Sequence, residues 1–340
     1  MPSPAAFLPV LPIGITMGCP VGIGPEIIVR MLSSPVDVGG RLVVLGDAGV
    51  LRRAARALAI DIPVREWEPG QEIEPGTIPV LPLSRLDAEK LAWGRPDRET
   101  GRAMGAYIEE AVRLIQAGVL GAMVTAPIGK KPLQEAGYPY PGHTEMLAAL
   151  CGADEYAMML AGDRLRVTLV TIHMALAGVP AALTPEKVLR LIEITGRSLR
   201  RDFGVPAPRL AVAGLNPHAG ECGLFGDEEE RVIAPAVAAA RRQGWQAAGP
   251  LPPDTVFHQA ANGRYDAVVC MYHDQGLIPF KLLHFADGVN ATLGLPIVRT
   301  SVDHGTAYDI AGKGVASPTS LEAACRLAAR IAANRRRAAG

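Results

Sequence analysis

Short apolar runs alternate with longer amphipathic segments along most of the chain, and no other feature constrains the fold as strongly. The apolar runs predict strands at residues 14–17, 41–45, 122–125, 166–172, 210–213, 267–271 and 291–293. The longer segments predict helices at residues 24–32, 48–58, 99–117, 143–150, 185–202, 227–242 and 321–334. Because the strand runs are apolar throughout, helices should cover both faces of the sheet. The pattern therefore predicts an α/β fold with a largely parallel sheet and crossover helices.

Residues 65–98 break this alternation. They are rich in Pro, Gly, Glu and Arg and only weakly periodic, so we expect loops and edge elements there. Thr184 followed by Pro185, in contrast, is a clear helix start, with an N-cap and a proline at the first helical position. The length of 340 residues suggests about two domains. Because the first strand lies so near the N-terminus, both ends of the chain can belong to one domain.

Charge and composition argue against several classes of protein. The 34 basic and 34 acidic residues cancel, which disfavours a strongly basic nucleic-acid binder and an acidic disordered tail. We expect the basic stretch at residues 334–337 to be a solvated helix end. A membrane span needs roughly 18 consecutive apolar residues, and the sequence has no such run. The first basic residue is Arg30, so we expect no secretory signal peptide.

The cysteines indicate the compartment. They are odd in number, scattered, and form no C-x-x-C pair, which predicts free thiols in a reducing cytoplasm. We therefore expect a cytoplasmic protein, with neither a disulfide framework nor a zinc knuckle. The residues concerned are Cys19, Cys151, Cys222, Cys270 and Cys325.

Three histidines, His173, His218 and His273, each follow a predicted strand. In an open parallel sheet, ligands bind at the edge where the strands end. Imidazole is a common ligand of divalent first-row metals, and three imidazoles suffice for a catalytic site with open positions. Each histidine alone could be an ordinary polar loop residue, and their wide separation in sequence does not prove convergence. Their shared placement nevertheless favours a metal site.

Two further features suit an anionic ligand. The string Gly142-His143-Thr144-Glu145 opens a predicted helix, whose free N–H groups attract phosphate or carboxylate, although Thr144 could be a plain helix cap. Arg299 follows the apolar residues 295–298, which we expect to end at the ligand edge of the sheet. A cation at that edge suits an anionic substrate.

The N-terminal turn Gly18-Cys19-Pro20-Val21-Gly22-Ile23-Gly24-Pro25-Glu26 is rich in glycine but lacks the third glycine of the dinucleotide fingerprint. Lys130 and Lys131 follow Gly129 but precede no Ser or Thr, so a phosphate-binding P-loop is not supported either.

Several longer strings show a family resemblance. They are Gly22-Ile23-Gly24-Pro25-Glu26, Gly142-His143-Thr144-Glu145, Asn216-Pro217-His218-Ala219-Gly220-Glu221, Tyr272-His273-Asp274-Gln275-Gly276 and Arg299-Thr300-Ser301-Val302-Asp303-His304-Gly305-Thr306. With these strings, the chain resembles, from residue 14 to about residue 332, the 4-hydroxythreonine-4-phosphate dehydrogenase family, whose members are NAD-dependent enzymes of pyridoxal phosphate biosynthesis.

The resemblance implies a set of site residues. His173, His218 and His273 would bind a divalent zinc, magnesium or cobalt ion, with His273 reaching the metal of a partner subunit in a homodimer. The phosphorylated substrate would be held by His143, Thr144, Lys281, Asn290 and Arg299. Asp254 or Asp274 could be the general base, or could orient a ligand imidazole.

The resemblance also implies the fold of isocitrate and isopropylmalate dehydrogenases: two α/β/α domains with a cleft between them. We expect residues 1–130 and 300–340 on the cofactor side, and residues 131–299 to serve substrate, metal and dimerisation. NAD or NADP would bind a loop containing His304, Gly305, Thr306, Ala307 and Asp309. One departure is Cys19, which stands where many relatives carry an acidic residue; we expect a packed thiol without a catalytic role.

The implied reaction is the oxidation of 4-phosphooxy-L-threonine to 2-amino-3-oxo-4-phosphooxybutanoate, which decarboxylates to 3-amino-2-oxopropyl phosphate. Related dehydrogenases that act on D-threonate or D-erythronate 4-phosphate, or on a cis-dihydrodiol carboxylate, are alternatives within the family. A phosphate acyltransferase, which can share the fold, is the alternative from another class. It would need neither the histidine site nor the cofactor loop. We expect no nucleic-acid or membrane partner.

Overall fold

The structure, a computed structural model, describes residues 11–35 and 37–339. The first ten residues, on which the expectation of no signal peptide partly rests, lie outside the described residues. The chain divides into two compact units, the first formed by residues 1–151 and 297–329 and the second by residues 152–296 and 330–340.

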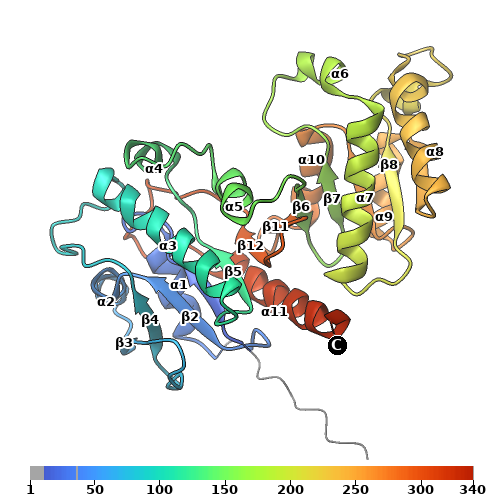
Figure 1. The fold of residues 1–340 in the computed structure, drawn as a ribbon. Helices are drawn as coiled ribbons and strands as arrows, with labels where there is room; N and C mark the ends of the chain where they lie inside the picture. The colour runs from blue at the N-terminus through green and yellow to red at the C-terminus, as the bar shows by residue number, and fades with distance from the viewer. Residues whose placement is uncertain (1–10, 36, 340) are drawn as a thin grey trace, which may run out of the picture. The chain divides into compact units, whose positions relative to one another are not determined.

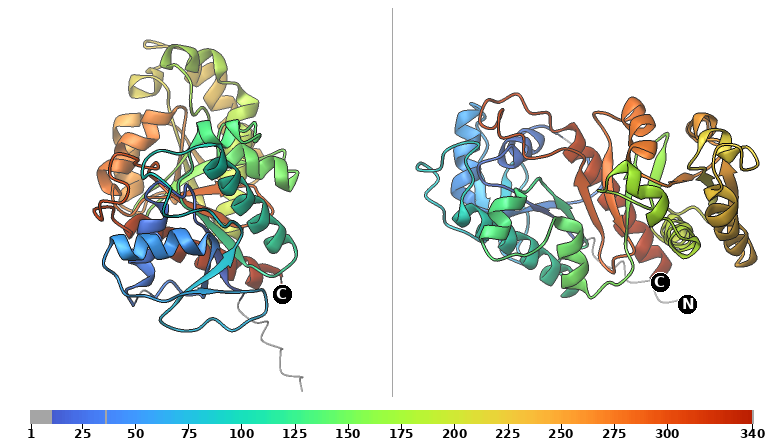
Figure 2. Two further views of the ribbon diagram at one scale, coloured as in Figure 1. Left: turned by 90° about the vertical axis from the view of Figure 1, so that its left-hand side faces the viewer. Right: turned by 90° about the horizontal axis from the view of Figure 1, so that it is seen from above.

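The described residues of the first unit form strands in the order β3-β4-β2-β1-β5-β12, and neighbouring strands run parallel. Helix α3 covers one face of this sheet, while α1 and α2 pack together on the other (Figures 1 and 2). The elements are β1 (Ile13–Thr16), α1 (Gly24–Leu32), β2 (Leu42–Gly46), α2 (Ala48–Ala57), β3 (Val64–Glu66), β4 (Ile78–Pro82), α3 (Arg98–Gln116), β5 (Ala122–Thr125), α4 (Lys130–Glu135), α5 (His143–Cys151), β12 (Arg299–Val302) and α11 (Thr319–Ala339), whose last residues belong to the second unit.

The second unit has its strands in the order β11-β6-β7-β10-β8-β9, and only β6 runs antiparallel to its neighbours. Helices α7 and α8 lie on one face, and α9 and α10 on the other (Figure 1). The elements are β6 (Ala157–Ala161), β7 (Arg166–Leu169), η1 (Leu176–Gly178), α6 (Val179–Ala182), α7 (Pro185–Arg201), β8 (Arg209–Ala213), η2 (Pro217–Gly220), η3 (Glu229–Ile233), α8 (Ala234–Arg242), β9 (Gln246–Leu251), α9 (Pro253–Ala261), β10 (Ala267–Cys270), α10 (His273–Leu283) and β11 (Val289–Leu293).

The core of the second unit explains this layering. Val167, Ala211 and Val268 stand side by side on β7, β8 and β10 and are fully buried beneath Phe280 of α10. Apolar strands covered on both faces are what the sequence predicted, and the mostly parallel α/β class is confirmed.

All of the predicted strands and helices are present, with ends shifted by a few residues. Other strands and helices were not predicted, because their sequences lack the usual signals. Strand β6 is Ala-Met-Met-Leu-Ala, which lacks β-branched residues, and β9 contains Gly249 and Pro250. Helix α10 contains Gly276 and Pro279, which weaken the helical signal. Residues 65–98 hold β4 and most of β3, and β3 is the edge strand of its sheet, as the expectation of edge elements allows.

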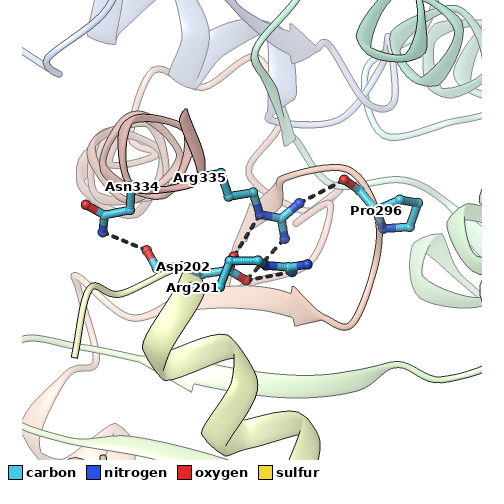
Figure 3. A network of polar contacts seen from close by, with 5 residues as sticks. All are labelled: Arg201, Asp202, Pro296, Asn334 and Arg335. Atoms are coloured by element: carbon cyan, nitrogen blue, oxygen red, sulfur yellow. Dashed lines mark hydrogen bonds and ion pairs between the residues drawn. The ribbon is translucent and has the colours of Figure 1, made fainter. Parts of the chain in front are cut away.

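The prediction of a solvated helix end at residues 334–337 is wrong for its first two residues (Figure 3). Arg335 donates from Nε and Nη2 to the carboxylate of Asp202, at 2.7 and 3.1 Å, and from Nη1 to the Pro296 carbonyl, at 2.9 Å. Asn334 donates to the Asp202 carbonyl. Arg201 completes the ion pairs of this carboxylate, which is only 2% exposed.

None of the described helices is long and apolar enough to cross a membrane. All five cysteines are free, as the sequence predicted, and Cys19, Cys270 and Cys325 are buried.

Candidate active site

The three predicted metal ligands follow three neighbouring parallel strands of the second unit. Strand β10 lies between β7 and β8. His173 comes after β7, His218 lies in the turn η2 after β8, and His273 is the first residue of α10 after β10. The predicted placement beyond the strand ends is found, and the neighbouring parallel strands bring the three turns to one edge of the sheet.

Two of the three imidazoles lie close together. The ring centroids of His173 and His273 are 5.8 Å apart, whereas His218 lies beside Phe225, with centroids 6.3 Å apart. Within the part of one chain that the structure describes, no group of three or more His, Cys, Asp or Glu side chains is arranged to hold a metal ion. One chain therefore presents a histidine pair and a third histidine after a neighbouring strand.

The donor chemistry fits a divalent first-row metal. Nδ1 of His273 lies 2.7 Å from Oδ1 of Asp274, and a carboxylate in that position leaves Nε2 available to a metal. This contact supports an orienting role for Asp274. Asp254, the other candidate base, is exposed in the first turn of α9, a helix that packs against η2.

Arg299 and His143, two of the predicted phosphate-binding residues, belong to the first unit and lie within electrostatic reach of each other. The guanidinium of Arg299, only 4% exposed, donates from Nη2 and Nε to the Thr125 hydroxyl at 2.8 and 3.2 Å. Burial lowers the pKa of Arg299 to about 9, partly offset by Glu145, so the side chain stays charged at neutral pH. Burial, and then the charge of Arg299, lower the pKa of His143 well below its ordinary value, so His143 is neutral.

The prediction that residues 295–298 end at the ligand edge of the sheet is wrong, because they lead into the amino end of a strand, β12. Arg299 is the first residue of that strand. Its register partner on β5 is Met123, and its guanidinium reaches Thr125, the last residue of that strand. The charge therefore does lie at the carboxyl end of β5, because the long Arg299 side chain extends along β5 from Met123 to Thr125. Strand β12 was not predicted, because it begins with a charged residue.

The five predicted substrate residues come from both units. His143 and Thr144 open α5 in the first unit, as predicted, and Nε2 of His143 is buried without a hydrogen-bond partner among the described residues. Lys281 on α10 and Asn290 on β11 belong to the second unit. Oδ1 of Asn290 is also buried without such a partner. Unsatisfied buried polar atoms of this kind are commonly completed by a ligand or an ordered water.

The predicted cofactor loop connects β12 to α11 and is held by α1. The buried carboxylate of Glu26 accepts from the backbone N–H groups of Gly312 and Ala316, at 3.1 and 3.2 Å. Arg30 donates to the carbonyls of Gly314 and Ala316, at 2.8 and 3.0 Å. His304, Gly305 and Asp309 are exposed on this loop, and Thr306 and Ala307 are half-buried.

The contacts of Glu26 and Arg30 with this loop were not predicted from the sequence. A glutamate on the apolar face of a short helix was the available signal, because a buried carboxylate needs partners.

Cys19 is a packed thiol, as expected. It is fully buried and its sulfur accepts a hydrogen bond from the Tyr308 hydroxyl at 3.5 Å. Burial raises the pKa of the thiol, so it is protonated at neutral pH and is a poor nucleophile.

Comparison with known proteins places this chain in a family. The family model of "Pyridoxal phosphate biosynthetic protein PdxA" matches residues 39–328. A 4-hydroxythreonine-4-phosphate dehydrogenase from Desulfosudis oleivorans is 58% identical over 325 residues, 93% of this chain and 94% of that protein. The crystal structure of a 4-hydroxythreonine-4-phosphate dehydrogenase from Klebsiella pneumoniae is 45% identical, with a TM-score of 0.88, covering 96% of this chain and 99% of that one.

A terephthalate 1,2-cis-dihydrodiol dehydrogenase from Burkholderia xenovorans LB400 is more distant, at 31% identity and a TM-score of 0.65, covering 94% of this chain and 98% of that one. The fold and these matches define an α/β oxidoreductase. The chain belongs to the family of pyridoxal phosphate biosynthetic proteins PdxA.

Proposed function

We propose that this enzyme oxidises 4-phosphooxy-L-threonine with NAD or NADP and a divalent metal ion. The secondary alcohol becomes the ketone of 2-amino-3-oxo-4-phosphooxybutanoate, and loss of carbon dioxide then yields 3-amino-2-oxopropyl phosphate. The observation that carries the proposal is the placement of His173, His218 and His273 after three adjacent parallel strands. Relatives at high identity over nearly the whole chain bear the corresponding name.

The metal would be held by these histidines and would act as a Lewis acid toward the substrate hydroxyl. Asp274 would keep the His273 imidazole in the tautomer whose Nε2 is free to bind. We propose that the site is completed in a homodimer, with His273 reaching the metal of the partner subunit. Asp254 remains the candidate acceptor for the hydroxyl proton.

Exposed apolar side chains support the homodimer. Ile278, Leu282 and Phe285 on and just after α10 are 67%, 85% and 83% exposed, at spacings that place them on one side of the helix. Leu176 and Leu224, near the other two histidine turns, are also exposed. Such a concentration is typical of an interaction surface. A second copy covering it would lie beside the histidines.

The phosphate would be bound by the buried charge of Arg299, with the neutral His143 as a hydrogen-bond partner. A neutral imidazole can donate from one nitrogen without adding a second buried charge next to the guanidinium. Thr144, at the start of α5, would add the N-terminus of a helix. Lys281 and Asn290 would supply contacts from the second unit. Binding of the remote phosphate would orient the carbon that is oxidised.

The nicotinamide cofactor would lie against the loop that contains His304, Gly305, Thr306, Ala307 and Asp309. When bound, it accepts the hydride of the substrate alcohol. Glu26 and Arg30 would keep the loop in shape through the four backbone groups they bind.

The metal and cofactor strings are shared within the family, so substrate choice is tested at the phosphate. A cis-dihydrodiol carboxylate lacks the phosphate for which a buried Arg299 beside His143 is suited. Reduction of NAD should therefore be measured with 4-phosphooxy-L-threonine, D-erythronate 4-phosphate and a cis-dihydrodiol carboxylate, each with and without EDTA. We expect chelator-sensitive NADH formation with the first. Turnover of only the dihydrodiol would overturn the proposal.

A further inference from the structure

The backbone of one residue, Met271, makes hydrogen bonds to both of the turns that carry His173 and His273. The carbonyl of Met271, just after β10, accepts a hydrogen bond from the Thr171 hydroxyl at 2.8 Å and one from the Thr171 backbone at 3.2 Å. The N–H of Met271 donates to Oε1 of Gln275 at 2.6 Å. Thr171 lies two residues before His173, and Met271 lies two residues before His273. Met271 is fully buried and Thr171 is only 7% exposed, so solvent does not compete for these bonds.

The same glutamine also reaches the third turn. Nε2 of Gln275 donates to the carbonyl of Gly214 at 2.6 Å, and the side chain is only 7% exposed. Gly214 directly follows β8 and begins the segment that leads to His218. A single amide therefore joins the ends of β10 and β8, using its acceptor on one strand and its donor on the other. No other side-chain type of this length offers both.

Beyond Gly214, a buried carboxylate shapes the segment that leads to His218. Oε1 of Glu229, a residue 3% exposed, accepts from the N–H groups of Leu215 and Asn216 at 2.6 and 2.7 Å. His218 has the left-handed φ of 53°. An unfavourable conformation of this kind persists only where the surroundings enforce it. Buried or partly buried hydrogen bonds thus link the three turns, from Thr171 through Gln275 to Glu229.

We propose that Gln275 is a positioning residue for the metal site: its amide sets the spacing between the His218 and His273 turns and thereby the affinity for the ion. This inference rests on the proposed metal-dependent function. Groups that orient metal ligands from behind affect binding because the ion tolerates little displacement of its ligands. Gln275 contacts neither substrate nor metal in this account.

The test is the affinity of the metal-free, full-length Gln275→Leu protein for Co²⁺, measured by titration calorimetry, together with the visible spectrum of the cobalt form. Leucine has a similar size but neither the donor nor the acceptor. We expect the dissociation constant for Co²⁺ to rise by roughly 10- to 100-fold and the ligand-field bands to shift. The isosteric variant Gln275→Glu cannot donate to Gly214 as a carboxylate, so it should weaken cobalt binding and shift the bands as the leucine variant does. It replaces Gln275→Leu in the test if the leucine variant does not fold.

Two further variants make the result specific. Thr195→Val removes a buried hydrogen bond of 3.0 Å to Thr168, inside the same unit but outside the three histidine turns. It should lower the melting temperature while leaving the cobalt affinity within about twofold of wild type, as expected for a purely structural effect. His218→Ala should abolish tight cobalt binding.

The outcomes distinguish the positioning role of Gln275 from the existence of the metal site. Weakened binding in the Gln275 variants, with Thr195→Val unchanged, supports the positioning role. If His218→Ala loses the metal while both Gln275 variants bind it as tightly as wild type, the positioning role is refuted and the proposed metal site stands. If His218→Ala binds cobalt like wild type, the metal site itself is refuted.

Discussion

At the scale of single residues, burial and charge decide the chemistry of the site. Arg299 remains charged despite burial, and its charge helps to keep His143 neutral, so the pair presents one cation and one uncharged donor. The sequence identified both residues, because an isolated cation after an apolar run and a helix start are local patterns. The sequence could not show that Arg299 and His143 act on each other, because the two residues are far apart in the chain. The same is true of Arg299 and Thr125, whose hydroxyl binds the guanidinium.

Replacing Arg299 tests the phosphate contact. Arg299→Ala should raise the KM for the phosphorylated substrate about 10- to 100-fold, because a charge-assisted hydrogen bond contributes about 1.5–3 kcal/mol. Steady-state kinetics with varied substrate measures this change. Arg113→Ala, which removes an exposed partner of Glu110 in the same unit, is the control and should leave KM unchanged. An unaltered KM in the Arg299 variant would place the phosphate elsewhere.

Cys19 is expected to be dispensable for chemistry. Because burial keeps the thiol protonated, Cys19→Ser, which retains an acceptor for the Tyr308 hydroxyl, should keep kcat within about threefold of wild type. Turnover at saturating substrate and cofactor measures this directly. A loss of kcat by two orders of magnitude, with the circular dichroism spectrum preserved, would instead assign a chemical role to the thiol.

At the scale of elements, connections between segments distant in sequence account for most of what the sequence did not predict. Strand and helix positions follow from local periodicity, and those predictions are confirmed. Glu26 contacts residues 312–316, which lie 286 to 290 residues further along the chain. Asp202 contacts the end of α11, 133 residues away. No local pattern specifies such partners, although a buried carboxylate always implies that partners exist.

The loop held by α1 can be tested through cofactor binding. Glu26→Ala leaves the N–H groups of Gly312 and Ala316 without their acceptor, each at a cost of about 1–3 kcal/mol if they remain buried. We expect the KM for NAD to rise about tenfold or more, while the KM for substrate changes little. Glu322→Ala, which removes a partly buried partner of Arg326 on α11, is the comparison variant. Equal KM values for NAD in all three proteins would contradict a cofactor role for this loop.

The carboxylate of Asp202 should contribute strongly to stability. Asp202→Ala leaves Arg335, whose side chain is only 16% exposed, without its carboxylate partner, and breaking such a buried pair costs about 3–5 kcal/mol. Urea unfolding followed by circular dichroism measures the loss. Asp227→Ala, which breaks an exposed pair with Arg231, should cost less than about 1 kcal/mol. A similar loss in both variants would mean that the Asp202 network is as weak as a surface pair.

At the scale of the whole molecule, two α/β units divide the predicted site residues between them, and homology over nearly the full chain accounts for the function. Composition and charge disfavoured a nucleic-acid binder, but they could not identify a substrate. That information is carried by a few strings at strand ends, which became interpretable because the parallel sheet places β7, β10 and β8 next to one another.

Global stability should fall in acid. Burial alone would raise the pKa of Asp202, but its bonds and charge interactions with Arg335 and Arg201 outweigh this and hold the pKa below its ordinary value. Such a group stabilises the fold above its unfolded pKa of about 3.9, and this contribution is lost as the pH falls through the folded pKa. The free energy of unfolding should therefore decrease from about pH 5 downward, less steeply in Asp202→Asn. Identical slopes would refute this assignment.

The most direct test of the account is complementation between two inactive variants. His218→Ala and His273→Ala should each lack metal-dependent NADH formation from 4-phosphooxy-L-threonine. If His273 completes the site of the partner subunit, mixed dimers regain one intact site, and an equimolar mixture after subunit exchange should recover about a quarter of wild-type activity, as random pairing of protomers predicts. A mixture that stays inactive although mixed dimers form would contradict the shared site, and full activity in either single variant would contradict the histidine metal site itself.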